Sequence, residues 1–271
     1  MKIEEQMSQL RLAGMRHRYI SLTETRQLQN LSLKEGLELL LQAETENRET
    51  RRTERLTTQA RFRYKASLSE ISYADSRNLN KNLIAALSDC SFIAKGESII
   101  ITGATGCGKS FLASALGQQA CLMGFKVMYS PNSIMFQLLR IARLDGSWVK
   151  TMEQIAKQQL LILDDFAITG MDKQQAIDLM EVIEDRHNKN ATIIATQLPI
   201  AAWYDIIPDS TIADAILDRL VHTATRIEPQ GDSLRKNRNF VSIFNPNNNK
   251  RSEGSTSPKY TQHPIQKPSR R

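Results

Sequence analysis

Residues 103–110 have the sequence Gly-Ala-Thr-Gly-Cys-Gly-Lys-Ser, which is the G-x-x-x-x-G-K-S pattern of a Walker A phosphate loop. The β-branched run 98–102 before it predicts a buried strand, and the Ala- and Leu-rich run 111–122 after it predicts a helix. A glycine-rich turn between strand and helix directs backbone N–H groups and the positive helix end toward one anion. We therefore expect Lys109 to contact the β- and γ-phosphates of a nucleotide and the Ser110 hydroxyl to ligate Mg²⁺.

A second apolar run, 160–163, ends in two aspartates and has the form of a Walker B strand. Parallel α/β sheets bind their ligands at the C-terminal ends of the strands. We expect Asp164 to hold Mg²⁺ and Asp165 to act as the general base that deprotonates the attacking water. Most ATPases with this arrangement carry Glu at the second position, so the shorter Asp165 predicts slow hydrolysis that suits a switch.

Three later segments offer further groups for the phosphates. The run 191–195 predicts a third buried strand, and either Thr196 or Gln197 at its end could contact the γ-phosphate or the attacking water. A plain strand end is an equal alternative for each of the two. Apolar residues at helical spacing predict a helix around Arg219, and Arg235 lies in the first turn of another predicted helix. Composition by itself favours solvated ion-pair roles for both arginines.

Taken together, these segments resemble a known order of motifs. Walker A, Asp164-Asp165, 196–199, 218–220 and 231–235 occur in the order found in AAA+ ATPases of the DnaA/DnaC branch. The stretches 213–222 and 61–64 make the chain more closely similar to the IstB-like helper proteins of insertion-sequence transposition. This similarity covers roughly residues 5 to 245.

The resemblance implies an α/β AAA+ fold with a central parallel sheet, preceded by a small all-helical domain. It also implies ATP and Mg²⁺ as cofactors, homo-oligomers with ATP at the subunit interfaces, duplex DNA bound without sequence specificity, and a partner transposase from the same element. Arg219 would be an arginine finger for the neighbouring subunit and Arg235 a second sensor arginine, so that Lys109, Asp165 and Arg219 form the catalytic set. The residues expected to contact the nucleotide are Gly103, Ala104, Thr105, Gly106, Cys107, Gly108, Lys109, Ser110, Phe111, Thr196, Gln197 and Arg235.

The excess positive charge lies at the two ends of the chain. Residues 1–70 hold 13 Lys and Arg against 10 Asp and Glu, 71–245 hold 17 against 18, and 246–271 hold 6 against 1. We expect these three parts to be a helical N-terminal domain, an AAA+ ATPase domain and a disordered basic tail with too few apolar residues to fold. Basic ends beside a balanced domain favour binding to a polyanion, although basic tails also serve solubility alone.

Contacts with DNA are expected in two places. The segment 133–156 holds more predicted helix than a minimal ATPase needs, and Met135, Leu138, Leu139 and Ile141 are expected to pack inward there. The side chains expected to contact DNA phosphates are Arg140, Arg143, Lys150, Arg61 and Arg63. A solvated helix face is the alternative for these charges.

The remaining features restrict the class of protein. No apolar run approaches the length of a membrane span, the N-terminus lacks a signal peptide, and three cysteines lack metal-ligand spacing, so we expect a cytoplasmic protein without a membrane partner. Three other functions stay open: a DnaC-like helicase loader acting on single-stranded DNA, a metabolic P-loop kinase, and a DNA-binding scaffold that does not hydrolyse ATP. The Ser32-Leu33-Lys34-Glu35 capping box predicts the start of a helix in the N-terminal domain.

Overall fold

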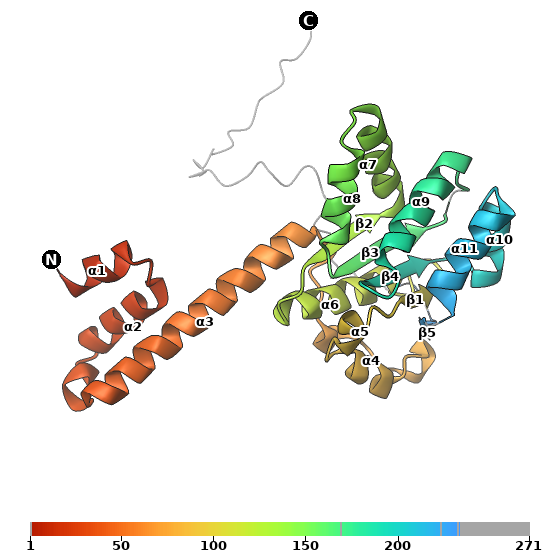
Figure 1. Cartoon of the computed structure of the whole chain (residues 1–271). Helices are drawn as coiled ribbons and strands as arrows, with labels where there is room; N and C mark the ends of the chain where they lie inside the picture. The colour runs from red at the N-terminus through yellow and green to blue at the C-terminus, as the bar shows by residue number, and fades with distance from the viewer. Residues whose placement is uncertain (1, 169, 223, 232, 234–271) are drawn as a thin grey trace, which may run out of the picture.

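The structure is a computed structural model that describes residues 2–168, 170–222, 224–231 and 233. A small helical lobe at the N-terminus is joined to a larger α/β domain by one long helix (Figure 1). The elements of this first part are α1 (Ile3–Gln9), α2 (Ala13–Glu24), the short 3-10 helix η1 (Gln27–Asn30) and the long helix α3 (Leu33–Ala60).

The long helix α3 begins at the predicted capping box, which is confirmed. The Glu35 N–H donates to the Ser32 hydroxyl at 3.3 Å, and the Ser32 N–H donates to the Glu35 carboxylate at 2.8 Å. The helix ends at Ala60 because Arg61 takes a left-handed backbone conformation with a φ of 57°.

Glu44 of α3 holds the helical lobe together. Its carboxylate is buried and accepts the N–H groups of Gly14 and Met15 at 2.8 and 3.3 Å. These are N–H groups of the first turn of α2, which have no partner inside that helix. The Arg48 guanidinium, 2.7 Å from Glu44, partly balances the buried charge.

The α/β domain follows a linker at residues 61–67. Its helices are α4 (Lys81–Leu87), α5 (Ser91–Ala94), α6 (Lys109–Leu122), α7 (Asn132–Leu144), α8 (Trp148–Ala156), α9 (Lys173–Arg186), α10 (Trp203–Ile206) and α11 (Ser210–Val221), with 3-10 turns η2 (Leu68–Glu70), η3 (Asp75–Arg77) and η4 (Ile200–Ala202). Its strands are β1 (Ile99–Thr102), β2 (Val127–Pro131), β3 (Leu160–Phe166), β4 (Ala191–Thr196) and β5 (Thr225–Ile227).

Within the described part of the chain, the five strands form one parallel sheet in the order β2-β3-β4-β1-β5. The strand β4 lies between β1 and β3, so the end of β4 separates the Walker A loop from the Walker B carboxylates. The register of β3 against β4 shifts between Leu163 and Phe166, and within this bulge Asp165 has a φ of 54°. The bulge turns the Asp165 side chain out of the regular alternation of the strand.

The sheet is covered on both faces by helices, and each face has its own apolar core (Figure 1). Ile99 and Ile101 of β1 pack with α6 on one face, whereas Ile100 packs with α7, α9 and α11 on the other. The core beneath α6 also contains Leu56 of α3 and Phe62 of the linker, so the end of α3 is built into the α/β domain.

The α/β fold with a parallel sheet and a preceding helical part, which the sequence predicts, is confirmed. The prediction that Leu138 and Ile141 pack inward is wrong, because their exposed fractions are 37% and 57%. The same prediction is confirmed for Met135 and Leu139, which are buried together with Ala142 at helical spacing and with Phe136. The expected basic tail at 246–271 lies outside the described residues.

Candidate nucleotide-binding site

The Walker A residues form the turn between β1 and α6. Gly106 and Gly108 have φ values of 85° and 101°, a region that residues with a Cβ rarely adopt. A Cβ on Gly103 would lie 2.6 Å from the carbonyl oxygen of Pro229, and a Cβ on Gly106 would collide with the Ser233 side chain. Pro229 and Ser233 therefore lie directly against the phosphate loop, and only glycine fits beside them at positions 103 and 106.

Lys109, the first residue of α6, has its ammonium group within the loop. Its Nζ donates to the carbonyl oxygens of Gly103 and Ala104, each at 2.8 Å. The four-carbon side chain can rotate to exchange such carbonyl contacts for the phosphate oxygens of a nucleotide. Phe111, two residues further along α6, packs against Tyr64 and Ala66, so its ring belongs to a small apolar cluster.

A hydroxyl and a carboxylate meet at the expected metal position. The Ser110 hydroxyl donates to Oδ1 of Asp164 at 2.8 Å, and the Tyr129 hydroxyl donates to Oδ2 of the same carboxylate. Asp164 is almost fully buried, with 1% of its surface exposed. Burial and the charge of Asp164 raise the pKa of Tyr129, which keeps the phenol protonated as a donor.

This donor set fits magnesium. Mg²⁺ prefers oxygen ligands and usually takes one or two from the protein, with water and phosphate oxygens completing the octahedron. Ser110 and Asp164 supply such oxygens beside the phosphate loop. Among the described residues, no cluster of three or more His, Cys, Asp or Glu side chains offers an alternative metal site of the all-protein kind.

Asp165 is paired with an arginine from the linker. Nη1 of Arg63 lies 2.7 Å from Oδ2 of Asp165 and 3.4 Å from Oδ2 of Asp164. Arg63 was expected to face DNA, but the structure places it half-buried against the two Walker B carboxylates. Arg61 is exposed and lines a cavity of about 1020 Å³ together with Arg63, Asp165 and residues of β2, α7 and α8.

The structure distinguishes the two polar residues at the end of β4. Thr196 is fully buried, and its hydroxyl donates to the Phe166 carbonyl at 2.8 Å and accepts the Leu198 N–H at 3.1 Å. The Gln197 side chain instead reaches the phosphate loop, where Oε1 accepts the Thr105 hydroxyl at 2.6 Å. Gln197 is thus the one of the two whose side chain can respond to an occupied loop.

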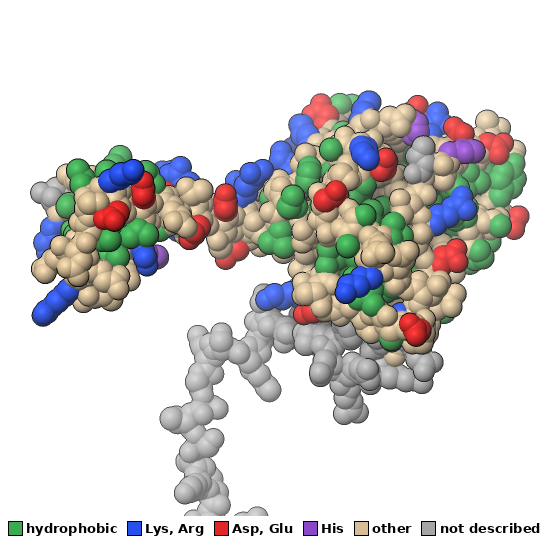
Figure 2. Space-filling view, turned by 90° about the horizontal axis from the view of Figure 1, so that it is seen from below, with side chains coloured by type: hydrophobic (Ala, Val, Ile, Leu, Met, Phe, Trp, Pro, Cys, Tyr) green, Lys and Arg blue, Asp and Glu red, His purple; other side chains and the backbone are tan. Residues whose placement is uncertain are grey.

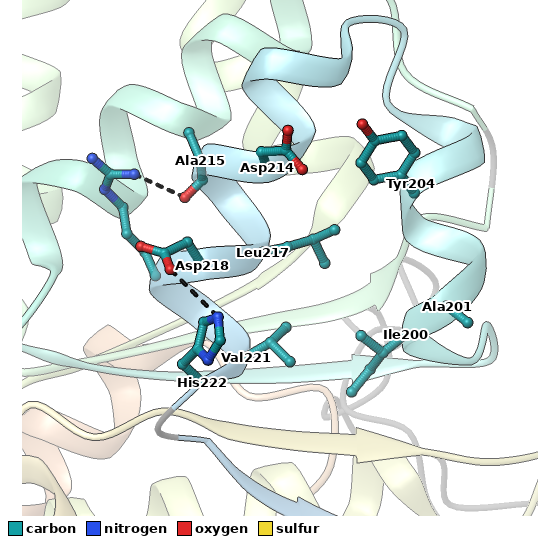
Figure 3. Close-up of a pocket in the computed structure, with 10 residues that line it drawn as sticks. Ile200, Ala201, Tyr204, Asp214, Ala215, Leu217, Asp218, Val221 and His222 are labelled. Carbon is teal, nitrogen blue, oxygen red and sulfur yellow. Dashed lines mark hydrogen bonds and ion pairs between the residues drawn. The ribbon is translucent and has the colours of Figure 1, made fainter.

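Arg219 of α11 is held within its own chain. Its Nε lies 2.5 Å from the Glu184 carboxylate of α9, and its Nη1 donates to the Ala215 carbonyl at 2.9 Å. Beside Arg219, residues of α11, η4 and α10 line an open pocket of about 720 Å³ (Figure 3). Asp218 and His222 at this pocket pair with each other. Arg235 lies outside the described residues.

The basic residues of α7 and α8 have different surroundings. Arg143 pairs with Asp178 at 2.6 Å and Glu181 at 3.2 Å, and its guanidinium lies over the Trp148 ring at 3.7 Å from the ring centroid. Arg140 and Lys150 are exposed, and within the described ranges neither takes part in a hydrogen bond or ion pair. On the face shown in Figure 2, Lys and Arg side chains are interspersed with Asp and Glu.

Sequence reasoning missed two residues that contact predicted site residues: Tyr129, which bonds to Asp164, and Glu184, which pairs with Arg219. Tyr129 is the middle residue of β2, the strand next to β3, but a single tyrosine in an apolar run carries no signal of a site. Glu184 was also missed, although its helix packs against α11. No helix among the described residues is long and apolar enough to cross a membrane.

Comparison with solved structures relates the fold to replication proteins. The chain aligns with the DnaI structure at a TM-score of 0.52 and 17% identity, covering 61% of this chain and 92% of DnaI. It aligns with AMPPCP-bound DnaA from Aquifex aeolicus at 0.52 and 18%, covering 62% of this chain and 51% of DnaA. The chain thus spans about half the length of that DnaA chain, and at this identity the likeness shows a shared AAA+ fold.

Comparison with curated sequences gives closer relatives. An insertion-sequence ATP-binding protein of Sinorhizobium fredii (strain NBRC 101917 / NGR234) is 37% identical over 86% of this chain and 95% of its own length. The ATP-binding protein of insertion sequence IS1162 from Pseudomonas fluorescens is 38% identical over 72% of this chain and 84% of its own length. The family described as IstB-like ATP binding protein matches residues 5–242. This chain, in which Ser110 of the Walker A loop bonds to Asp164, therefore belongs to the IstB-like family of ATP-binding proteins.

Proposed function

We propose that this chain is an ATP-dependent, DNA-binding helper of insertion-sequence transposition. It binds and slowly hydrolyses Mg·ATP, assembles on duplex target DNA without sequence preference, and recruits the transposase of the same element. Hydrolysis then dismantles the assembly. The insertion-sequence relatives support the biological setting, and the AAA+ fold supports a nucleotide-driven switch.

One observation carries the chemical part of this proposal. Ser110, Asp164 and Asp165 lie in one network at the C-terminal edge of the sheet, beside Lys109 of the phosphate loop. Lys109 and the loop N–H groups bind the phosphates, and Ser110 with Asp164 would hold Mg²⁺, which neutralises charge on the phosphates when bound. Asp165 takes the proton of the attacking water. Gln197 contacts the γ-phosphate or that water.

The position of Arg219 on a surface helix supports the proposed assembly. In the isolated chain its guanidinium is neutralised by Glu184, next to the open pocket between α10 and α11. A neighbouring subunit that presents a γ-phosphate to this face offers a stronger partner than one exposed carboxylate. The nucleotide then links two subunits, so ATP binding and oligomerisation stabilise each other.

Phosphate contacts on duplex DNA fall to exposed cations, of which Arg140 and Lys150 on α7 and α8 are the first candidates. Neither is engaged by a carboxylate within the described ranges, so neither must break an ion pair to bind DNA. Arg143, held by Asp178 and Glu181, contributes to the shape of this surface through the α7–α9 contact.

Sedimentation of the purified chain with duplex DNA, with and without ATP and Mg²⁺, tests the proposal. A large DNA-bound assembly that forms only with Mg·ATP is the expected result. A parallel run with single-stranded DNA separates the helper from a helicase loader, because the loader would favour the single strand. A monomer that ignores both forms of DNA contradicts the proposal.

A further inference from the structure

Arg63 is held in place by the linker on both sides of it. Phe62 is buried and packs edge-on against Tyr129, with ring centroids 6.1 Å apart. The Tyr64 carbonyl accepts the Gln118 side-chain amide of α6 at 2.7 Å. The backbone at Arg63 is therefore anchored on α6 and β2, and its side chain contacts the two Walker B carboxylates.

The contact with those carboxylates is charge-assisted and partly shielded from water. Arg63 is 28% exposed, whereas Asp164 and Asp165 are 1% and 36% exposed. Burial alone lowers the pKa of Arg63, but the hydrogen bond and charge of Asp165 outweigh it, so the net direction is upward and the guanidinium stays charged.

The expected metal position and Arg63 lie at the same carboxylate, that of Asp164. Oδ1 of Asp164 accepts from Ser110, and Oδ2 accepts from Tyr129 and faces Arg63. A divalent cation between Ser110 and Asp164 would lie close to a fixed positive charge, and like charges repel most strongly where water is partly excluded. Mg²⁺ held beside Ser110 would thus compete with the Arg63 guanidinium for the negative charge of Asp164.

We propose that Arg63 is a positioning residue that restrains Asp165 in the nucleotide-free chain and must leave the carboxylates before the metal binds. This inference rests on the proposed use of Mg·ATP. Arg63, in the segment that follows α3, thereby sets the Mg²⁺ concentration at which the site binds nucleotide. It also keeps Asp165 from acting as a base until the metal is bound.

The test is a Mg²⁺ titration of binding by a fluorescent ATP analogue, which requires no turnover. Arg63→Gln removes the charge but keeps a hydrogen-bond donor, and we expect its half-saturating Mg²⁺ concentration to fall about fivefold or more. Arg63→Met, a second neutral variant that keeps the aliphatic stem, is expected to show the same fall. Arg63→Lys keeps the charge and should stay close to the wild type.

Arg52→Gln is the matched control. Arg52 also joins α3 to the α/β domain, through a 3.0 Å hydrogen bond to the Gly124 carbonyl, but it does not contact either Walker B carboxylate. Its Mg²⁺ requirement should equal that of the wild type. Thermal melts without Mg²⁺ or nucleotide establish that each variant is folded.

The outcomes separate this inference from the proposed function. If the neutral Arg63 variants bind the analogue with an unchanged or increased Mg²⁺ requirement, the competition does not exist and the inference is overturned. If the wild-type chain itself binds no nucleotide at any Mg²⁺ concentration, the proposed function fails first.

Discussion

The Thr105 hydroxyl donates a 2.6 Å hydrogen bond to Oε1 of Gln197 and so connects the phosphate loop with the end of β4. In the proposed site, a γ-phosphate bound in the loop would lie beside this pair, where Gln197 could orient the phosphate or the attacking water. We expect Gln197→Ala to lower kcat for ATP hydrolysis about 100-fold, with ATP affinity within about threefold of the wild type. Steady-state kinetics together with nucleotide titration measure both quantities.

Thr196→Val is the comparison for that experiment. Its hydroxyl bonds only to the backbone at Phe166 and Leu198, so its loss is expected to lower the free energy of unfolding by about 1–3 kcal/mol. Hydrolysis per folded molecule should change little. Wild-type turnover in Gln197→Ala, or a selective loss in Thr196→Val, would reverse the assignment.

Lys109→Ala is expected to weaken ATP binding about 10- to 100-fold, because a charged hydrogen bond to phosphate contributes roughly 1.5–3 kcal/mol. Equilibrium titration with a fluorescent ATP analogue measures the affinity. Lys157→Ala serves as the control, since this exposed lysine at the C-cap of α8 pairs, among the described residues, only with Glu153, four positions earlier. Undiminished affinity in Lys109→Ala would contradict the site.

Arg219→Ala is expected to bind ATP normally but to hydrolyse it about 1,000-fold more slowly, as removal of an arginine finger does. In the proposed assembly the finger acts on the next subunit, so mixing Arg219→Ala with Lys109→Ala chains should restore part of the activity at interfaces that combine the two intact residues. The mixture is assayed by phosphate release with DNA present. An arginine that acts only within its own chain gives no restoration.

Arg140→Ala and Lys150→Ala are each expected to reduce the log–log salt slope of duplex-DNA affinity by about 0.9, the effect of one lost phosphate contact. Arg143→Ala should instead lower the melting temperature, because it breaks the pairs with Asp178 and Glu181 and the contact with Trp148. Fluorescence anisotropy at several salt concentrations gives the slopes. If the variant that carries both Arg140→Ala and Lys150→Ala has the same salt slope as the wild type, these two residues do not contact DNA.

Arg186 offers a test of the fold apart from the site. Its buried guanidinium donates to the carbonyls of Ile155, Gln158 and Ala191 and lies 3.3 Å from the Thr192 hydroxyl. Burial lowers the pKa of Arg186 to about 10, so it is still protonated at neutral pH.

Arg186→Met would leave these buried carbonyls without their donor. We expect the free energy of unfolding to fall by about 3 kcal/mol, measured by chemical denaturation. Lys189→Met, which loses only an exposed pair with Asp185, should change it by less than about 0.5 kcal/mol. Equal losses of unfolding free energy in both variants would show that the Arg186 hydrogen bonds do not stabilise the fold.

The sequence predicts well those features that are local. The Walker A loop, the strand before it and the helix after it are contiguous, and the Ser32–Glu35 capping box spans four residues. The Asp164-Asp165 pair is recognised because it ends an apolar run. Each of these signals is read within about one element, where periodicity and turn chemistry act directly.

The contacts that could not be predicted join distant segments. Arg63 meets Asp165 across 102 positions, and Arg143 meets Asp178 across 35. Arg140 and Arg143 look alike in the sequence, since both are cations on one amphipathic helix. Only the packing of α9 against α7 makes one of them an ion-pair partner and leaves the other exposed.

The length of α3 makes it a long lever between the helical lobe and the α/β domain. Its 28 residues extend over about 42 Å at 1.5 Å per residue. Leu56 and Ala60 fix one end in the α/β core, three residues before Arg63, while Glu44 attaches the lobe nearer the other end. A pivot of about 10° beside the nucleotide therefore carries the far tip through about 7 Å, more than the pitch of an α-helix. An angular change at the nucleotide end of α3 would therefore reach the helical lobe as a displacement larger than one helical turn.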